Sequence, residues 1–440
     1  MRRLAVVLLL LLAPLSARAL EIERVVSPGG IEAWLVEEHS NPILAVSFTF
    51  LGGSATDPVG KEGRARLATA LLDEGAGDLD SQAFQSELEK RSIELSFSVT
   101  DDEITGSLVT LTDQRSRAAE LLALALHQPR FDEEPVERIR AQLSVRVAER
   151  ANDPGSLAYE TLQQQIFAEH PYGRSTEGTL DSLKALSVDD LRAYVSQRLS
   201  LDTLKIGVVG DITPEELGLL LDQVFGGLAK ESPPIAVTEA ELPDQGKLTV
   251  IDMPVPQSVL YMAQPGPKRN DPDYYAAAVL NQILGGGTFS SRLYEQVREQ
   301  KGLAYSVWSD LVDRDRAGLW MAGAATQNAR VADTLAIMRD VWTQLATDGP
   351  TAAEVKDAIT YLTGSFALRL ASSDGIARIL VSMQRDNLGI DYLDRRSALY
   401  EAVTVDDVKR VAQQWLDPEQ LVIVIAGQPE GVESSPGAPQ

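Results

Sequence analysis

The chain has 440 residues, of which 44% are hydrophobic and 24% are charged, and its formal net charge at pH 7 is −24. This composition is typical of a globular protein with a large core, and the acidity argues against nucleic-acid binding, because contacts with phosphates need a basic surface. The chain contains no cysteine, which excludes disulfides and thiolate metal sites.

Residues 1–19 are predicted to form a secretory signal peptide. A basic start at residues 1–3 precedes an apolar run over residues 4–15, and Ala17-Arg18-Ala19 fits a small-x-small cleavage site. We expect cleavage after Ala19, which removes three arginines and lowers the net charge to −27. No later stretch is apolar for long enough to span a bilayer, and a lipobox cysteine is absent, so we expect no membrane anchor. The expected location is a bacterial periplasm, with secretion to the medium as the second possibility.

The rest of the chain is too long for one core and is predicted to be a tandem duplication. Residues 186–191, LSVDDL, recur as residues 403–408, VTVDDV, and the register then continues without a gap. Each copy predicts a capped helix, a short turn and a buried strand, at residues 204–209 in the first copy and 421–426 in the second. The acidic pair of each copy is interpreted as first-turn helix residues favoured by the helix dipole.

The segments before the two copies also correspond in their order. Residues 87–99, a helix end and a strand, have the same pattern as residues 295–308. Each is followed by another strand and then by two helices, which are predicted at 116–126 and 329–345 and from near Glu134 and Ala353 onward. The predicted fold class is therefore α+β, with two tandem homologous α/β-sandwich domains.

Composition places the boundaries of these domains. Residues 229–247 contain prolines and charges with little periodicity, which is typical of a linker. The N-terminal domain is accordingly predicted over residues 20–228 and the C-terminal domain over residues 248–427. Residues 428–440 are rich in Pro, Gly and Ser and are predicted to be disordered.

Residues 289–308 predict a helix, a sharp stop and a strand. Ser290 or Ser291 is a candidate helix cap, and Gly302 is suited to the left-handed conformation that ends a helix. Arg298 then lies in the last helical turns and Tyr305 at the start of the strand, where both can donate to one acceptor. The alternative is that Arg298 caps helix carbonyls and Tyr305 belongs to the core.

With its two α+β halves and its acidic, exported character, the chain resembles the pitrilysin/insulinase-type family of zinc peptidases. The second half carries the resemblance in Ser291-Arg292-Leu293, Val297-Arg298-Glu299 and Gly302-Leu303-Ala304-Tyr305-Ser306. The first half carries it in Gly52-Gly53-Ser54, Asp57-Pro58, Gly63-x-Ala65, His170-Pro171-Tyr172-Gly173-Arg174 and Gly178-Thr179. The resemblance covers nearly the whole mature chain.

The resemblance implies that metal chemistry would lie on the helix after Gly63, where the family has an inverted zinc motif, H-x-x-E-H. By position, Arg66 replaces the first histidine, Thr69 the glutamate base and Ala70 the second histidine. The glutamate that the family places on a later helix falls near Arg146. Arginine is not deprotonated to bind a metal and alanine has no donor atom, so we expect this chain to bind no zinc.

No other residues replace the lost motif. His39 is expected in a hairpin turn, His127 at a helix end and His170 in a loop, each with a local hydrogen bond, and no two have metal-ligand spacing. The glycine-rich stretch 285–288 lacks the rest of a phosphate loop and is interpreted as a flexible connector. Asp101-Asp102-Glu103 is expected to be a solvated hairpin tip.

Three basic residues stand near the degenerate motif. If the helices pack as in the family, Arg64, Arg66 and Arg146 occupy the metal position and bind a neighbouring carboxylate.

The family resemblance also implies a role for the second half. In the family, an Arg and a Tyr spaced like Arg298 and Tyr305 hold the substrate backbone and stabilise the tetrahedral oxyanion. Gly286, Gly287 and Phe289 are expected to line the same cleft. Some bacterial members divide the work between two chains, of which one carries the zinc motif and the other carries the Arg/Tyr pair. This sequence resembles the second kind.

The functional hypothesis is thus a zinc-less subunit of a periplasmic heterodimeric metallopeptidase. Zinc would be bound by a homologous partner subunit, peptides would be the substrates and would add to a strand edge, and the chain alone would be inactive. The alternative is a non-enzymatic scaffold or assembly protein with the peptidase fold. An independent peptidase with a new mechanism is disfavoured, because the sequence shows no replacement nucleophile or metal cluster.

Overall fold

The computed structural model describes residues 20–287 and 289–436. The predicted signal peptide, Thr288 of the glycine-rich connector and residues 437–440 of the tail lie outside the described residues. Within the described part, none of the helices combines the length and apolarity that crossing a membrane requires.

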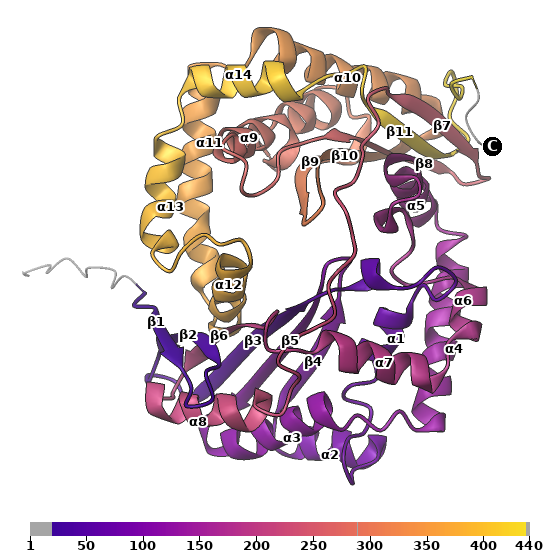
Figure 1. The fold of residues 1–440 in the computed structure, drawn as a ribbon. Coiled ribbons are helices and arrows are strands. Elements are labelled where there is room, and N and C mark those ends of the chain that lie inside the picture. Colours follow the sequence, from indigo (N-terminus) through magenta and orange to yellow (C-terminus); the bar gives the residue numbers. More distant parts are fainter. Residues whose placement is uncertain (1–19, 288, 437–440) are drawn as a thin grey trace, which may run out of the picture.

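Two mixed sheets with the same topology form the two halves (Figure 1). The first has the order β1-β2-β6-β3-β5-β4, with β1 (Glu23–Val26), β2 (Glu32–Glu37), β3 (Ile43–Leu51), β4 (Glu94–Val99), β5 (Glu103–Leu111) and β6 (Lys205–Gly210). The second has the order β7-β11-β8-β10-β9, with β7 (Lys247–Asp252), β8 (Gln257–Pro265), β9 (Ala304–Arg314), β10 (Ala317–Gln327) and β11 (Val422–Gly427). In each sheet the strand that comes last in the chain pairs in parallel with an early strand: β6 pairs with β2, and β11 pairs with β7. The duplicated α+β fold is therefore confirmed.

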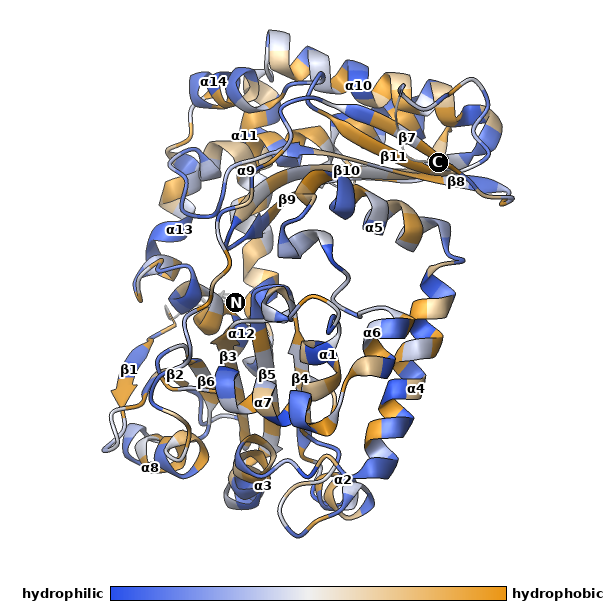
Figure 2. Cartoon of the chain, turned by 45° about the vertical axis from the view of Figure 1, so that its right-hand side comes forward, coloured by the Kyte–Doolittle hydropathy of each residue, from blue (hydrophilic) through white to orange (hydrophobic). Residues whose placement is uncertain are grey.

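Helices surround both sheets. In the first half they are α1 (Arg64–Thr69), α2 (Ser81–Lys90), α3 (Arg115–His127), α4 (Glu133–Arg150), α5 (Pro154–Phe167), α6 (Leu180–Ala185), α7 (Val188–Arg198) and α8 (Pro214–Phe225). In the second half they are α9 (Tyr274–Asn281), α10 (Val331–Asp348), α11 (Ala352–Gly364), α12 (Ser373–Arg385), α13 (Tyr392–Glu401) and α14 (Val405–Trp415). Figure 2 shows hydrophobic residues along the strands of both sheets, where these helices bury them.

The repeated helices α7 and α14 begin with the same capping box. Ser187 and Thr404 each accept a hydrogen bond from the backbone three residues on, at Asp190 and Asp407, whose carboxylates accept from the cap in return. The acidic pairs are thus first-turn residues, as the sequence predicted, and they satisfy backbone amides that the helix itself leaves free.

The two halves exchange one helix each. Helix α5 follows α4 in the first half but packs on β8 and β11 of the second sheet through Leu162 and Ile166. Helix α12 packs on β3 and β6 of the first sheet, where a Cβ at Gly207 would lie 2.3 Å from the carbonyl oxygen of Ala377. Only glycine permits this approach of helix to strand. The exchange interlocks the two halves. The predicted division into two domains at the linker does not anticipate this.

The tip between β4 and β5 is a contact between the halves and not the solvated turn that the sequence predicted. Asp101 pairs with Arg314 at 3.0 Å, and Glu103 lies 3.6 Å from Arg385 of α12. Burial raises the pKa of Asp102. Acidic side chains at a hairpin tip face solvent by default, but here the arginines of the second half cover them.

The linker begins against the first half, where the amide of Ser232 donates to Asp202, and then runs along the second half, as the tail does. Residues 231–246 have no regular structure, and the amide of Ala240 donates to the carbonyl of Arg316. The tail was predicted to be disordered, but residues 428–436 instead follow β7. The amide of Ser435 donates to the carbonyl of Leu248 at 2.8 Å, and Ser434 Oγ accepts from the amide of Val250 at 2.9 Å.

Candidate functional site

An Arg–Glu–Arg cluster occupies the position of the degenerate metal motif. Arg66 on α1 has its Nε 3.4 Å from Glu177 Oε1, and Arg146 on α4 has a guanidinium nitrogen 3.6 Å from Glu177 Oε2. Glu177 lies in the loop before α6, one residue before the Gly178-Thr179 motif. The carboxylate that the sequence reasoning expected near these arginines is thus Glu177. The sequence gives no signal for it beyond its place beside that motif.

The residues at this position do not fit zinc. Both guanidiniums are already ion-paired, and a guanidinium has no lone pair to offer a metal. Thr69 Oγ1 is buried without a hydrogen-bond partner, and Ala70 follows it at the end of α1. In the ranges that the structure describes, no set of three or more His, Cys, Asp or Glu side chains is placed to hold a metal ion.

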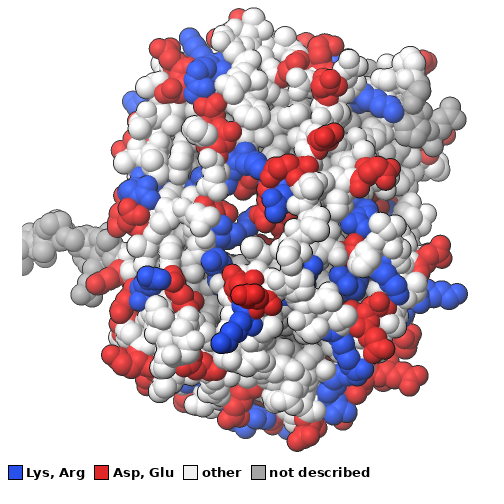
Figure 3. All heavy atoms as spheres, in the orientation of Figure 1, with Lys and Arg blue, Asp and Glu red and all other residues white. Residues whose placement is uncertain are grey.

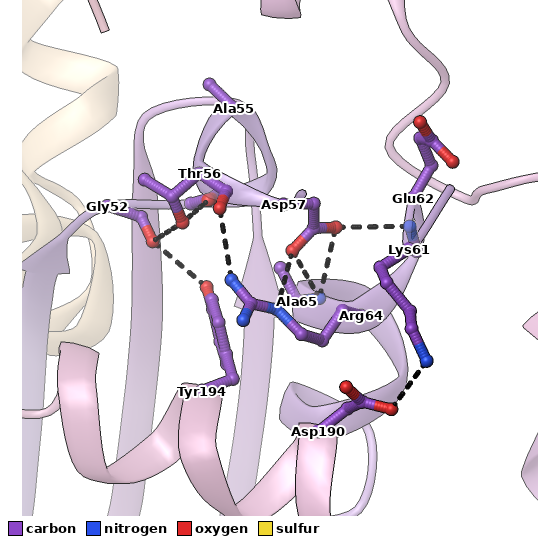
Figure 4. Close-up of polar contacts among 12 residues, drawn as sticks. Gly52, Ala55, Thr56, Asp57, Lys61, Glu62, Arg64, Ala65, Asp190 and Tyr194 are labelled. Atoms are coloured by element: carbon purple, nitrogen blue, oxygen red, sulfur yellow. Dashed lines mark hydrogen bonds and ion pairs between the residues drawn. The ribbon is translucent and has the colours of Figure 1, made fainter. Parts of the chain in front are cut away.

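Arg64 does not join this cluster, and the prediction that placed it there is wrong. Figure 4 shows that it points to Asp57, whose Oδ1 lies 3.3 Å from Arg64 Nε. The same carboxylate accepts hydrogen bonds from the amides of Gly63 and Ala65 at the start of α1. Burial raises the pKa of Asp57 to about 6, and Arg64 acts against this rise, so the group is ionised at neutral pH. Asp57 therefore anchors the first turn of α1.

The three histidines each have a hydrogen-bond partner, but the partners given below lie far away in the chain, whereas the sequence predicted local ones. His39 Nδ1 lies 2.7 Å from Asp211, His127 Nε2 lies 2.8 Å from the carbonyl of Val224, and His170 Nε2 lies 2.9 Å from the carbonyl of Thr238. The contact with Asp211, followed by one with Glu37, raises the pKa of His39.

Arg298 and Tyr305 meet across the turn at Gly302, which has the left-handed φ of +59°. Arg298 lies on the π-helix η5 (Tyr294–Gln300), whereas the sequence predicted an ordinary helix. Its guanidinium carbon is 4.7 Å from the ring centre of Tyr305 on β9 and 4.9 Å from that of Tyr294. Tyr305 is 82% exposed, so it does not belong to the core, and no side-chain hydrogen bond from Arg298 to a helix carbonyl is present among the described residues. The structure therefore differs from the alternative, in which Arg298 caps helix carbonyls and Tyr305 belongs to the core.

The pair opens into a cavity of about 630 Å³, called here the Arg298 hollow. Its wall includes Gly286, at the end of the π-helix η4 (Gln282–Gly286), and residues 305–311 of β9. Phe289 is exposed beside it and packs edge-on against Tyr294, with 5.3 Å between ring centres. Gly287 is next in the chain but does not line the hollow.

The metal position and the Arg298 hollow are separate places in this chain. All residues that line the hollow fall between Tyr274 and Tyr400, and neither α1 nor α4 contributes one. The chain thus brings Arg298 together with Tyr305, and Arg66 with Arg146, but does not join the two pairs in one cavity.

An ion pair fixes the segment that carries Arg298. Arg292 donates to both carboxylate oxygens of Glu354 on α11, at 2.7 and 2.9 Å. Burial acts to raise the pKa of Glu354, but hydrogen bonds from Arg292 and from Thr351 outweigh burial and lower the pKa to about 2. The charged pair holds η5 against α11 and so positions Arg298.

Replacing Glu354 with Gln should remove a part of the stability that depends on pH. Because the folded-state pKa is about 2 and the ordinary value is 4.5, the contribution of the pair is complete above pH 4.5 and is lost as the pH falls toward 2. We expect E354Q to lower the free energy of unfolding by about 1–2 kcal/mol at pH 7 and by less at pH 3, measured by urea unfolding. E401Q, at an exposed position on the same half, is the control. Equal losses for E354Q at the two pH values would contradict the assignment.

Comparisons with known families agree with the duplicated fold. Residues 33–180 match the family model described as insulinase (peptidase family M16), and residues 185–362 match the model described as peptidase M16 inactive domain. Together the two models match well over half of the chain.

Similar proteins are known from several bacteria. A solved structure of a peptidase M16 inactive domain from Pseudomonas fluorescens has a TM-score of 0.88 and 29% identity, and the match covers 95% of this chain and all of that one. A non-peptidase homologue from Helicobacter pylori is 28% identical over 342 residues, which cover 76% of this chain and 77% of the relative. An uncharacterized zinc protease from Mycobacterium leprae is 25% identical over 407 residues, or 91% of each chain.

Proposed function

The chain belongs to the insulinase family of peptidases, family M16, and we propose that it is the zinc-less subunit of a periplasmic heterodimeric metallopeptidase. The observation that carries the proposal is the open Arg298–Tyr305 pair. Among the described residues Arg298 has no carboxylate partner, and the hydroxyl of Tyr305 has no hydrogen-bond partner. Five guanidinium donors and one phenol are therefore free to bind a ligand.

A partner subunit is needed because this chain has ion-paired arginines where the family carries its zinc ligands. The partner would bind zinc and supply the histidines and the glutamate base. Arg298 and Tyr305 would donate hydrogen bonds to the substrate backbone and to the oxyanion that develops during peptide cleavage. Such donors act most strongly where water is excluded, and docking of the partner over the Arg298 hollow would provide this.

The substrate is proposed to be an extended peptide. Strand β9 is the outermost strand of the second sheet, and within the described residues it pairs with β10 alone. Its residues 305–311 line the Arg298 hollow, so a peptide that added to this edge would pass Tyr305. The carbonyl of Ser309 already accepts a hydrogen bond from Asn281, which limits the available edge to the part nearer Tyr305.

The proposed location is the periplasm. It rests on the predicted signal peptide over residues 1–19 and on the absence of cysteine.

The second candidate function is a non-enzymatic scaffold or assembly protein. It is favoured by the similar protein from Helicobacter pylori, which is described as a non-peptidase homologue. A scaffold has no use for an unpaired arginine stacked between two tyrosines at the mouth of a hollow, so the subunit proposal is preferred.

The first experiment is metal analysis and a peptide-cleavage assay on the isolated chain. We expect no stoichiometric zinc and no cleavage. Co-purification from the native cell envelope should recover an M16 partner with an H-x-x-E-H motif. Metal-dependent cleavage by the isolated chain would overturn the subunit proposal, and recovery of a stable complex without any peptidase would favour the scaffold.

A further inference from the structure

A second cavity adjoins the Arg298 hollow. It has a volume of about 810 Å³, is called here the Arg269 hollow, and lies between the second sheet and α12 and α13. Five residues line both hollows: Tyr274, Leu311, Arg369, Arg396 and Tyr400. The two hollows therefore form one continuous depression. Figure 3 shows a recess between the two halves, with Lys and Arg atoms and also Asp and Glu atoms at its border.

Four arginines in this depression have no carboxylate partner within the described residues: Arg269, Arg298, Arg369 and Arg396, called here the arginine cluster. Most other described arginines are ion-paired, and Arg198, Arg330 and Arg339, which are not, lie elsewhere in the fold. The chain carries a formal charge of −24, so carboxylates are abundant. A group of unpaired guanidiniums in one depression of so acidic a chain is unexpected unless an external anion pairs with them.

Aromatic rings hold three members of the cluster in place. The guanidinium carbon of Arg269 lies 4.2 Å from the ring centre of Tyr274, and that of Arg396 lies 3.9 Å from the ring centre of Phe366. Arg298 lies between Tyr294 and Tyr305. Arg269 also donates to the hydroxyl of Tyr392 at 2.9 Å, and Arg396 donates to the carbonyl of Leu362 at 3.0 Å. Stacking occupies the faces of a guanidinium, and the remaining N–H donors at its edge can bind a carboxylate.

Arg369 is the most accessible member. It lies on the turn η7 (Ser365–Leu370), is exposed, and donates no hydrogen bond to any described residue. It lines both hollows, so it stands where a ligand would pass from one to the other. Leu368 beside it is 78% exposed and offers an apolar contact at the same place.

The depression also contains three carboxylates, Asp310, Asp313 and Asp386, which are outnumbered. Six arginines line the two hollows, since Arg378 and Arg385 join the arginine cluster. Arg378 pairs with Asp374, and Arg385 pairs with Asp315 and Glu103 outside the lining and with Asp386 within it. Burial raises the pKa of each of the three aspartates. Among the described residues, the four unpaired members of the arginine cluster thus outnumber the two lining aspartates without an arginine partner, Asp310 and Asp313, and this excess of positive charge attracts anions.

We propose that this depression binds acidic peptide segments, with side-chain carboxylates of the ligand paired to the arginine cluster. The cavities are far larger than one small anion, and the arginines are distributed over both, which suits an extended chain with several carboxylates. The proposal rests on the proposed function only in taking the ligand to be a peptide. It assigns a substrate class: peptides whose sequence is acidic on one side of the cleaved bond, namely the side that enters the Arg269 hollow.

The test measures the binding of labelled peptides to the isolated chain by fluorescence anisotropy. Three labelled peptides of one length alternate alanine with glutamate, glutamine or lysine. We expect the glutamate peptide to bind at least about tenfold more tightly than the glutamine peptide, because each lost charged hydrogen bond is worth about tenfold, and the lysine peptide not to bind. R369Q should weaken binding of the glutamate peptide about tenfold, whereas R330Q, at an exposed unpaired arginine outside the depression, should leave it unchanged.

Equal binding of the glutamate and glutamine peptides would overturn the inference, as would an unchanged affinity in R369Q. Competition by inorganic phosphate as effective as that by the peptide would also overturn it, since a small-anion site would then suffice. Failure of this inference can be distinguished from failure of the proposed function. If the glutamate peptide binds but no complex cleaves any peptide, the subunit proposal fails alone. If a complex cleaves peptides without preference for acidic ones, the present inference fails alone.

Discussion

Replacing Arg298 with Ala should lower kcat/KM for peptide cleavage by the assembled complex about 100- to 1,000-fold, the usual cost of removing one donor to a developing oxyanion. The guanidinium has no carboxylate partner among the described residues and stacks on the exposed ring of Tyr305, so its removal breaks no ion pair of the fold. Tyr305→Phe keeps the stacked ring and removes only the hydroxyl, and we expect it to lower turnover about 100-fold.

Two controls separate catalysis from structure in this experiment. R330A, at an exposed arginine outside both hollows, should leave turnover unchanged. Size-exclusion chromatography of R298A with the partner should show that association is intact. Wild-type turnover in both R298A and Y305F would mean that the pair has no part in catalysis.

Replacing Asp57 with Ala should destabilise the first half by about 3–5 kcal/mol, which is the usual cost of removing one partner of a buried ion pair. The side chains of Asp57 and Arg64 are 2% and 9% exposed, so the variant leaves a guanidinium buried without its carboxylate. The amides of Gly63 and Ala65 lose their acceptor at the start of α1 as well. Urea unfolding at pH 7, where Asp57 is ionised, measures the loss.

The matched control for Asp57 is Arg192→Ala. Arg192 and Asp189 form an exposed pair at 3.7 Å on α7, and such pairs contribute about 0–1 kcal/mol. The double variant D57A/R64M should be less destabilised than D57A alone, because the unpaired charge is removed with its partner. A loss below about 1 kcal/mol in D57A would show that the pair does not anchor α1.

Local features of the fold followed from the sequence. The repeat at residues 186–191 and 403–408 predicted two copies of one unit, and both sheets have the same strand order. Gly302 ends its helix with a positive φ, and His127 is the last residue of α3. In each case the evidence lies within a few residues of the position, or in a repeat that the sequence shows directly.

Contacts between distant segments did not follow from the sequence. Glu177 pairs with two arginines that lie far from it in the chain, and a single sequence does not indicate which carboxylate closes such a cluster. The arginine cluster gathers one residue each from the loop before α9, η5, η7 and α13, and no sequence pattern in any of these segments singles out its arginine. The exchange of α5 and α12 depends on a close approach at Gly207, which one glycine does not announce. Tertiary packing decided all three.

The π-helical winding of η5 was likewise not predicted. The segment has the apolar spacing of an ordinary helix, with Leu293 and Val297 both fully buried, and this spacing does not distinguish the two windings. The winding still places Arg298 one turn before Gly302, so the predicted meeting of Arg298 with Tyr305 occurs.

The most direct test of the subunit hypothesis is a titration of the zinc-bearing M16 partner with this chain, in which the rate of peptide cleavage is measured at each ratio. We expect little cleavage by either chain alone, a rise with added chain that saturates at one chain per partner, and zinc in proportion to the partner only. Full activity of the partner without this chain, or cleavage and bound zinc in this chain without the partner, would contradict the account.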